Sequence, residues 1–150
     1  MIKAQKRARQ ILRKYNLSTA PIDLHKIVTA EGITLDEWSF RGRVKEVYVG
    51  DSIAIRSHTD KRKRRELIAH ALGHHFLHSG NQFYFESCDQ FVTFKQEHEA
   101  QCFATELLMP RELLTKTRQL PLSTAADYFL VTKNFLKLGF GTTQKGDLCH

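Results

Sequence analysis

Apolar residues recur with helical spacing at the start of the chain. Over residues 3–15 they fall on one stripe with basic residues elsewhere, which predicts an amphipathic helix. That stripe consists of Ala4, Ala8, Ile11 and Leu12. A second helix is predicted from Ile22 to Ala30, because Pro21 favours a helix start and Gly32 a helix end.

The spacing then changes to that of strands. Extended structure is predicted to begin at residues 33–35. Two strands are predicted over Val44–Val49 and Ser52–Arg56, because Gly50-Asp51 between them favours a tight turn. The first half of the chain therefore predicts two helices followed by a small, mostly antiparallel sheet.

From about residue 60 onward the pattern is mainly helical. The predicted helices cover residues 60–78, 96–109, 111–117 and 123–138, the last range as two short helices. The aromatic-rich segment 81–95 has no clear period and is predicted to be a loop with room for a short strand, forming a cleft wall. The last ten residues are predicted to be a tail. Together the elements predict an α+β fold in which residues 1–150 form a single domain.

The composition is ordinary for a globular protein, with 41% hydrophobic and 26% charged residues. No apolar run approaches the roughly 18 residues of a membrane span. The three cysteines are an odd number without the spacing of a disulfide framework. We therefore expect a cytoplasmic protein with two thiols in the core and one in the tail.

Positive charge, +7 in total, is concentrated in the N-terminal helix and in the run Lys61–Arg65. Such clusters can bind phosphate backbones or steer an acidic partner. Neither has the interleaved aromatic side chains of a single-strand binding surface, so solvated helix faces are the favoured interpretation. Direct nucleic-acid binding is possible on this charge but is not favoured.

His70 and His74 are the strongest candidates for chemistry. Two histidines four residues apart on a helix project in the same direction and can bind one metal ion. In zinc peptidases the residue after the first histidine is the glutamate that accepts a proton from metal-bound water. Here that residue is Ala71. The pair therefore predicts a zinc site without its general base.

A third ligand is expected on the helix predicted over 96–109. Its buried stripe consists of Ala100, Phe103, Ala104, Leu107 and Leu108. At about 100° per residue, Glu97 lies about 60° from the centre of the stripe and Glu99 about 100° away on the other edge. Small residues above Glu97 let this helix approach the histidine helix closely. Glu97 is therefore the predicted third ligand, with Glu99 as the fallback.

Three other histidines lie near these residues. A third ligand on one straight helix would be too far for a tetrahedral ion, so His78 is predicted to end the helix. His75 is predicted to pack or lie at the surface, and His98 to face solvent. Two histidines and one carboxylate leave a fourth position for water, which favours a catalytic zinc site over a closed structural one.

Residues 64–78 read Arg-Arg-Glu-Leu-Ile-Ala-His-Ala-Leu-Gly-His-His-Phe-Leu-His, and residues 97–110 match the pattern E-x-x-A-x-x-F-A-x-x-L-L-M-P. These two stretches resemble the zinc helix and the second signature of the ImmA/IrrE family of zinc metallopeptidases. The resemblance covers roughly residues 1–140. It implies a zincin-type helical core with C-terminal helices and one Zn²⁺ per chain, bound by His70, His74 and Glu97. It also implies that position 71 is the position of the general base.

The resemblance further implies a protein substrate, a helix-turn-helix repressor of a mobile element or stress regulon that is cut to release transcription. Alanine at position 71 implies a form that is inactive or nearly so. One origin is a natural pseudoenzyme that binds its partner without cutting. The other is a deliberate replacement of glutamate, which we favour because the rest of the motif is intact. A native gene that encodes alanine at this position would exclude the second origin.

Three residues are candidates for stabilising an oxyanion or contacting the substrate: His78, Tyr84 and Tyr128. The sequence does not distinguish among them. A rival function is binding of DNA or of a repressor without cutting, because residues 125–136 loosely resemble a helix-turn-helix. The apolar residues of that segment are expected in the core. The favoured role of this segment is therefore to pack beneath the zinc helices and to shape the substrate cleft.

Overall fold

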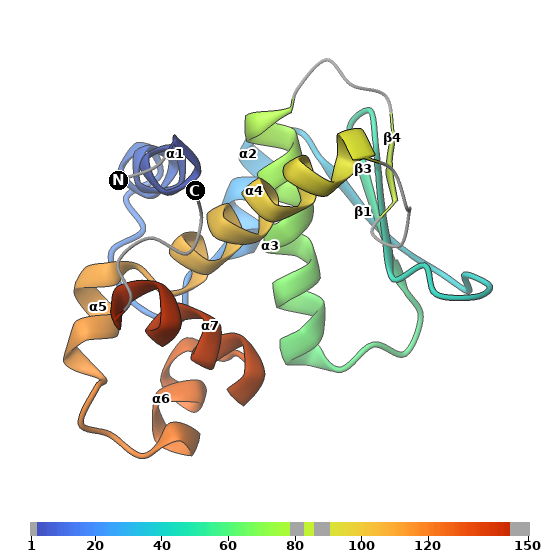
Figure 1. Ribbon diagram of the computed structural model, residues 1–150. Coiled ribbons are helices and arrows are strands. Elements are labelled where there is room, and N and C mark those ends of the chain that lie inside the picture. The colour runs from blue at the N-terminus through green and yellow to red at the C-terminus, as the bar shows by residue number, and fades with distance from the viewer. Residues whose placement is uncertain (1–2, 79–82, 86–90, 145–150) are drawn as a thin grey trace.

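The computed structural model describes residues 3–78, 83–85 and 91–144, which form an α+β fold (Figure 1). The helices are α1 (Lys3–Lys14), α2 (Leu24–Ala30), α3 (Lys61–Leu77), α4 (Phe91–Leu108), α5 (Arg111–Lys116), α6 (Leu122–Phe129) and α7 (Lys133–Gln144). The strands are β1 (Thr34–Trp38), β2 (Glu46–Val49), β3 (Ser52–Arg56) and β4 (Phe83–Phe85). The predicted fold class is confirmed.

The strands form one sheet in the order β1-β3-β2-β4. β1 pairs with β3 in parallel, whereas β2 pairs antiparallel with both β3 and β4. The sheet is therefore mixed but mostly antiparallel, as the sequence predicts. Its inner face is apolar around Tyr48, Ile53 and Ile55, which are all buried.

The centre of the fold is the packing of α3 against α4, with β2 and β3 also in contact with α3 (Figure 1). α3 begins where the Asp60 carboxylate accepts hydrogen bonds from the backbone N–H groups of Arg62 and Lys63. α4 contributes Ala100, Phe103, Ala104, Leu107 and Leu108, all fully buried, to the shared core. This packing fixes the relative positions of the two helices that carry the predicted metal ligands.

Several predicted boundaries differ from the observed ones. α2 begins at Leu24 rather than Ile22, because Asp23 caps it by accepting a hydrogen bond from Lys26 N–H. α4 begins at Phe91, inside the predicted loop, and the short strand allowed for there is β4. α7 continues to Gln144, so the predicted tail begins too early. The rest of the predicted tail and parts of the predicted loop lie outside the described residues.

The basic run at the start of α3 is not simply a solvated face. Arg62 donates to the Val131 carbonyl at 3.1 Å and pairs with Asp127 at 2.6 Å, and Arg65 donates to the Leu130 carbonyl at 3.2 Å. These bonds hold the turn between α6 and α7 against α3, so the solvated interpretation is wrong for both arginines. The sequence pattern could not reveal this, because the partners lie more than sixty residues away.

The segment that loosely resembles a helix-turn-helix packs into this structure. Phe129, Phe135 and Leu136 are buried, as expected for core residues. Leu130 ends α6 in the left-handed conformation, and the Thr132 hydroxyl accepts a hydrogen bond from Phe135 N–H at the start of α7. Its apolar positions therefore serve the core.

Two further expectations concern the cysteines and the membrane. Cys102 on α4 is buried but disulfide-bonded, so the expectation of a free core thiol is wrong for this residue. Among the described helices, none combines the length and apolar character needed to cross a bilayer.

Candidate metal centre

His70 and His74 lie one turn apart on α3 and are both buried. Their ring centroids are 5.0 Å apart. Residues four apart share a helix face, so both imidazoles are directed toward the same region of α4. The helical spacing seen in the sequence therefore produces two adjacent nitrogen donors.

Glu97 on α4 lies against both imidazoles. Its Oε2 is 2.7 Å from His70 Nε2, and its Oε1 is 2.8 Å from His74 Nε2. Burial alone would raise the pKa of Glu97, but the interactions with the two histidines outweigh it and lower that pKa to about 2. The structure thus brings together the three residues predicted as ligands, with Glu97 ionised.

The protonation states of this cluster suit a metal ion. Burial lowers the pKa of His74, and the interaction with Glu97 opposes that effect only in part. His74 is therefore neutral at pH 7. Neutral imidazole and ionised carboxylate are the forms that bind zinc, and two nitrogens with one oxygen are a common donor set for it. The residues present fit a zinc ion.

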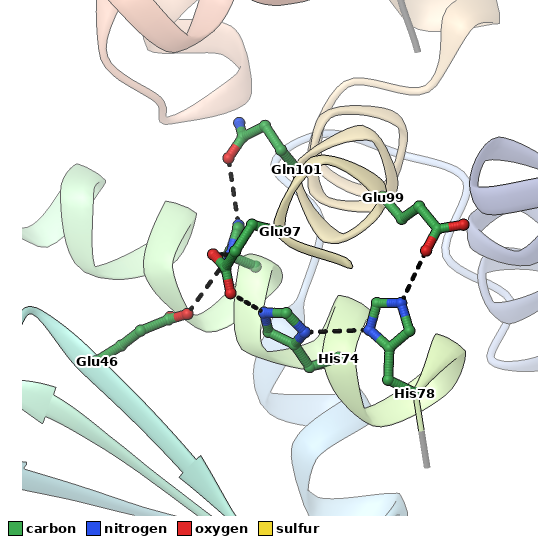
Figure 2. Close-up of polar contacts among 7 residues, drawn as sticks. Glu46, His74, His78, Glu97, Glu99 and Gln101 are labelled. Atoms are coloured by element: carbon green, nitrogen blue, oxygen red, sulfur yellow. Dashed lines mark hydrogen bonds and ion pairs between the residues drawn. The ribbon is translucent and has the colours of Figure 1, made fainter. Parts of the chain in front are cut away.

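A second layer of side chains orients the two imidazoles (Figure 2). The Gln101 side-chain oxygen lies 3.2 Å from His70 Nδ1. His74 Nδ1 lies 3.1 Å from His78 Nδ1, and His78 Nε2 lies 3.1 Å from a Glu99 oxygen. Hydrogen bonds at Nδ1 direct the opposite Nε2 atoms of His70 and His74 toward Glu97, as in many metal sites.

Two residues singled out in the sequence, Glu99 and His78, lie in this second layer. Glu99, the fallback ligand, lies beside His78 rather than beside the His70–His74 pair. His78 is the C-cap of α3, as predicted, and its imidazole lies between His74 and Glu99. That position lets His78 orient the His74 imidazole, and its oxyanion role stays a prediction. Gln101 was missed, although it follows Glu97 by one helical turn.

The other three residues come from β4, α6 and α4. Tyr84 is opposite Tyr48 in the pairing of β4 with β2, at the edge of the sheet. Tyr128 is exposed on α6 and packs its ring against Phe129. His98 is exposed, as predicted.

Position 71, where the sequence analysis predicts the general base, is fully buried. Ala71 has 0% of its surface exposed and belongs to the hydrophobic core. It precedes His75 by one turn of α3, and His75 Nδ1 lies 2.7 Å from the hydroxyl of Tyr48 on β2. Position 71 therefore lies on the side of α3 that faces the sheet.

A fourth residue at the cluster was missed by the sequence analysis. Glu46, the first residue of β2, is 2% exposed, and its Oε1 lies 3.8 Å from His70 Nε2. Ligand atoms of Glu46, His70 and His74 all lie within 4.8 Å of one another. The alternation of side chains along a strand could have revealed it. Glu46 and Tyr48 are two residues apart and share one face of the strand, so a charged residue occupies a core-facing position.

A cavity of about 470 Å³ adjoins the cluster at His70. It lies between α3, α4 and α7, with apolar walls at Phe135 and Leu138 and charged walls at Lys63 and Glu66. His70 is among the residues that line it. Helix α7 therefore helps to form the space beside the metal centre.

The fold and site define a class: an α+β protein with a candidate metal centre whose donors come from an H-x-x-x-H helix and a glutamate on the next helix. Residues 28–139 match the family model of the peptidase family described as the IrrE N-terminal-like domain, and the chain belongs to this family. This confirms the family resemblance found in the sequence.

One curated relative is the metallopeptidase ImmA of Bacillus subtilis (strain 168), to which the chain is 34% identical over 67 residues. The match covers 44% of this chain and 40% of that relative. The chain thus belongs to a metallopeptidase family, and such a family implies a bound metal, typically zinc.

Proposed function

We propose that this chain binds one zinc ion through His70, His74 and Glu97 and takes a helix-turn-helix repressor as its protein substrate. We further propose that Ala71 leaves it inactive or nearly so as an endopeptidase. The observation that carries the proposal is the Glu97 carboxylate within 2.8 Å of both imidazoles, next to a position 71 that has no carboxylate. A cytoplasmic location follows from such a substrate.

The chain's own residues perform the binding and orienting steps. Glu97 supplies the negative charge at the site, Gln101 orients His70, and the His78–Glu99 pair orients His74. A zinc ion held there would polarise a scissile carbonyl and lower the pKa of a bound water. No side chain at position 71 can accept the proton of that water. The missing base lowers the cleavage rate on the order of 10²–10⁴-fold.

The cavity beside His70 supports a protein substrate. Its apolar walls at Phe135 and Leu138 suit an aliphatic or aromatic side chain, and Lys63 and Glu66 offer polar contacts at its edge. The family resemblance supports the choice of a repressor as the protein that presents this side chain.

A second candidate is a natural pseudoenzyme, a zinc-containing regulator that binds a repressor without cutting it. Complete burial of Ala71 favours it, because the packing leaves little space for a catalytic carboxylate at that position. The two candidates share the metal ligands and the partner. They differ in whether glutamate at position 71 produces cleavage.

The test has two arms. Metal analysis of the purified chain is expected to give about one zinc per chain, and His70→Ala is expected to lose it. Purified helix-turn-helix repressors from the source genome are then incubated with the chain and with Ala71→Glu. Cleavage is expected with Ala71→Glu alone, and it disappears when His70→Ala is added. A chain without metal contradicts the ligand assignment, and rapid cleavage by the Ala71 form contradicts the mechanism.

A further inference from the structure

Glu46 brings a second buried carboxylate to the metal centre, from the sheet rather than from a helix. Figure 2 shows Glu46 extending from its strand toward the cluster, while Glu97 reaches it from α4. Its Oε1 lies 3.8 Å from His70 Nε2. The two carboxylates therefore approach the same imidazole from different elements of the fold.

The Glu46–His70 distance is close to that of a tetrahedral site, whereas the Glu97 oxygens, 2.7 and 2.8 Å from the imidazoles, would have to move away from them to admit an ion. With bonds of about 2.0–2.2 Å, neighbouring ligand atoms of tetrahedral zinc lie about 3.3–3.5 Å apart. Glu46 Oε1 is within a few tenths of an ångström of that separation from His70 Nε2, and it lies within 4.8 Å of the donor atom of His74. A small change in the Glu46 side chain would bring it into coordination.

The charges also balance. In the forms that bind metals, two neutral imidazoles and two ionised carboxylates carry a total charge of −2, which matches a divalent cation. Glu46 is 2% exposed, and buried carboxylates in proteins are characteristically paired with cations or bound to metals. An ion between Glu46 and Glu97 would be compensated entirely by the protein.

Residue 71 lies on the side of α3 from which Glu46 approaches. Ala71 lies on the side of α3 that faces β2, one turn before the His75 that contacts Tyr48. Glu46 and Tyr48 share one face of β2, since they are two residues apart. A glutamate at position 71 would place another long side chain on this side of α3, whereas alanine adds none.

We propose that Glu46 is the fourth protein ligand of the metal, so that His70, His74, Glu97 and Glu46 form a closed site without a bound water. This inference rests on the proposed zinc site and extends it. Such a site joins β2, α3 and α4 through one ion. It would stabilise the fold and slow hydrolysis, as expected for a site with structural character.

The test uses Co²⁺ in place of zinc and compares the unmodified chain with Glu46→Ala and Glu46→Gln. Glu37→Gln, an exposed glutamate on β1, is the matched control. The visible spectrum of the unmodified chain is expected to be tetrahedral and unchanged by azide. Both Glu46 variants are expected to bind metal about 10–100-fold more weakly, with spectra that azide alters because a position has opened.

Thermal melting adds a readout that needs no spectrum. Removing the buried Glu46 charge is expected to leave the metal-free protein as stable or more stable, while the increase in Tm on adding zinc becomes smaller. A metal-free variant that melts as the unmodified chain does also demonstrates that it folds. The Glu37→Gln control is expected to keep the full zinc-dependent increase.

The outcomes separate the two proposals. If the unmodified chain binds metal through His70 but already responds to azide, and the Glu46 variants bind as tightly, Glu46 is not a ligand and only this inference fails. If Glu46→Gln abolishes slow cleavage while affinity and spectrum stay unchanged, Glu46 is a general base, which also overturns it. A chain that binds no metal overturns the proposed function as well.

Discussion

Gly73 on α3 and Ala100 on α4 meet backbone to backbone. A Cβ added to Gly73 would lie 2.8 Å from Ala100 Cα and 2.9 Å from its carbonyl oxygen. Real Cβ atoms do not approach backbone atoms that closely, so only glycine permits this separation of the helices. The contact lies one residue before His74 and three residues after Glu97, and it sets the distance across which the ligands meet.

Gly73→Ala is therefore expected to push α4 away from α3. Overpacking of this kind costs about 1–3 kcal/mol of unfolding free energy, and the displaced Glu97 should bind zinc more weakly. Urea unfolding and zinc titration measure the two effects. Gly139→Ala is the control, since its added Cβ would meet mainly the flexible end of Met109. Equal losses in both variants would contradict the special role of the Gly73 contact.

Gln101 offers a test of the layer behind the ligands. Its side-chain oxygen lies 3.2 Å from His70 Nδ1, where it favours the tautomer that presents Nε2 to the metal. Gln101→Leu should weaken zinc binding about 10–100-fold without changing the stoichiometry. Gln101→Glu keeps the acceptor and should restore the affinity, which isothermal titration can measure. Weak binding by both variants would mean that Gln101 acts through packing alone.

Glu31 links the metal helix to the N-terminal helices. Its carboxylate lies 2.9 Å from His75 Nε2, accepts a short hydrogen bond from the Tyr15 hydroxyl, and pairs with Lys14 at 3.7 Å. Burial alone would raise the pKa of Glu31, but the bonds from Tyr15 and His75 outweigh it and hold that pKa below 4.5. A carboxyl group with a lowered pKa stabilises the fold above its unfolded pKa.

Glu31→Gln is accordingly expected to lower the unfolding free energy by about 1–2 kcal/mol at pH 7. The difference from the unmodified chain should shrink as the pH falls from about 4.5 through the lowered pKa, because both proteins then carry a neutral side chain. Chemical unfolding at several pH values measures this. Glu37→Gln removes an exposed ion pair with Arg64 and should cost less than 1 kcal/mol. A pH-independent loss at Glu31 would rule out the electrostatic explanation.

Which contacts of the fold and site could be predicted from the sequence depends on how far apart the contacting residues are along the chain. His70 and His74 are adjacent because of helical geometry alone, and Glu97 follows from the buried stripe of one helix. Glu46 depends on the register of β2 within the sheet and on the packing of the sheet against α3. The bonds from Arg62 and Arg65 to the α6–α7 turn likewise depend on long-range docking. No local period carries that information.

The effects of substitutions at position 71 and at Glu46 on the cleavage rate are expected to depend on each other. Ala71→Glu supplies a base, but the proposed ligand Glu46 would still hold the position that a water needs. The double variant Ala71→Glu/Glu46→Ala should therefore cleave a repressor faster than Ala71→Glu alone, by about tenfold or more, whereas Glu46→Ala alone gains little. Initial rates for all four proteins give the coupling. Equal rates for the double variant and Ala71→Glu would mean that Glu46 does not obstruct the reaction, and that position 71 alone controls it.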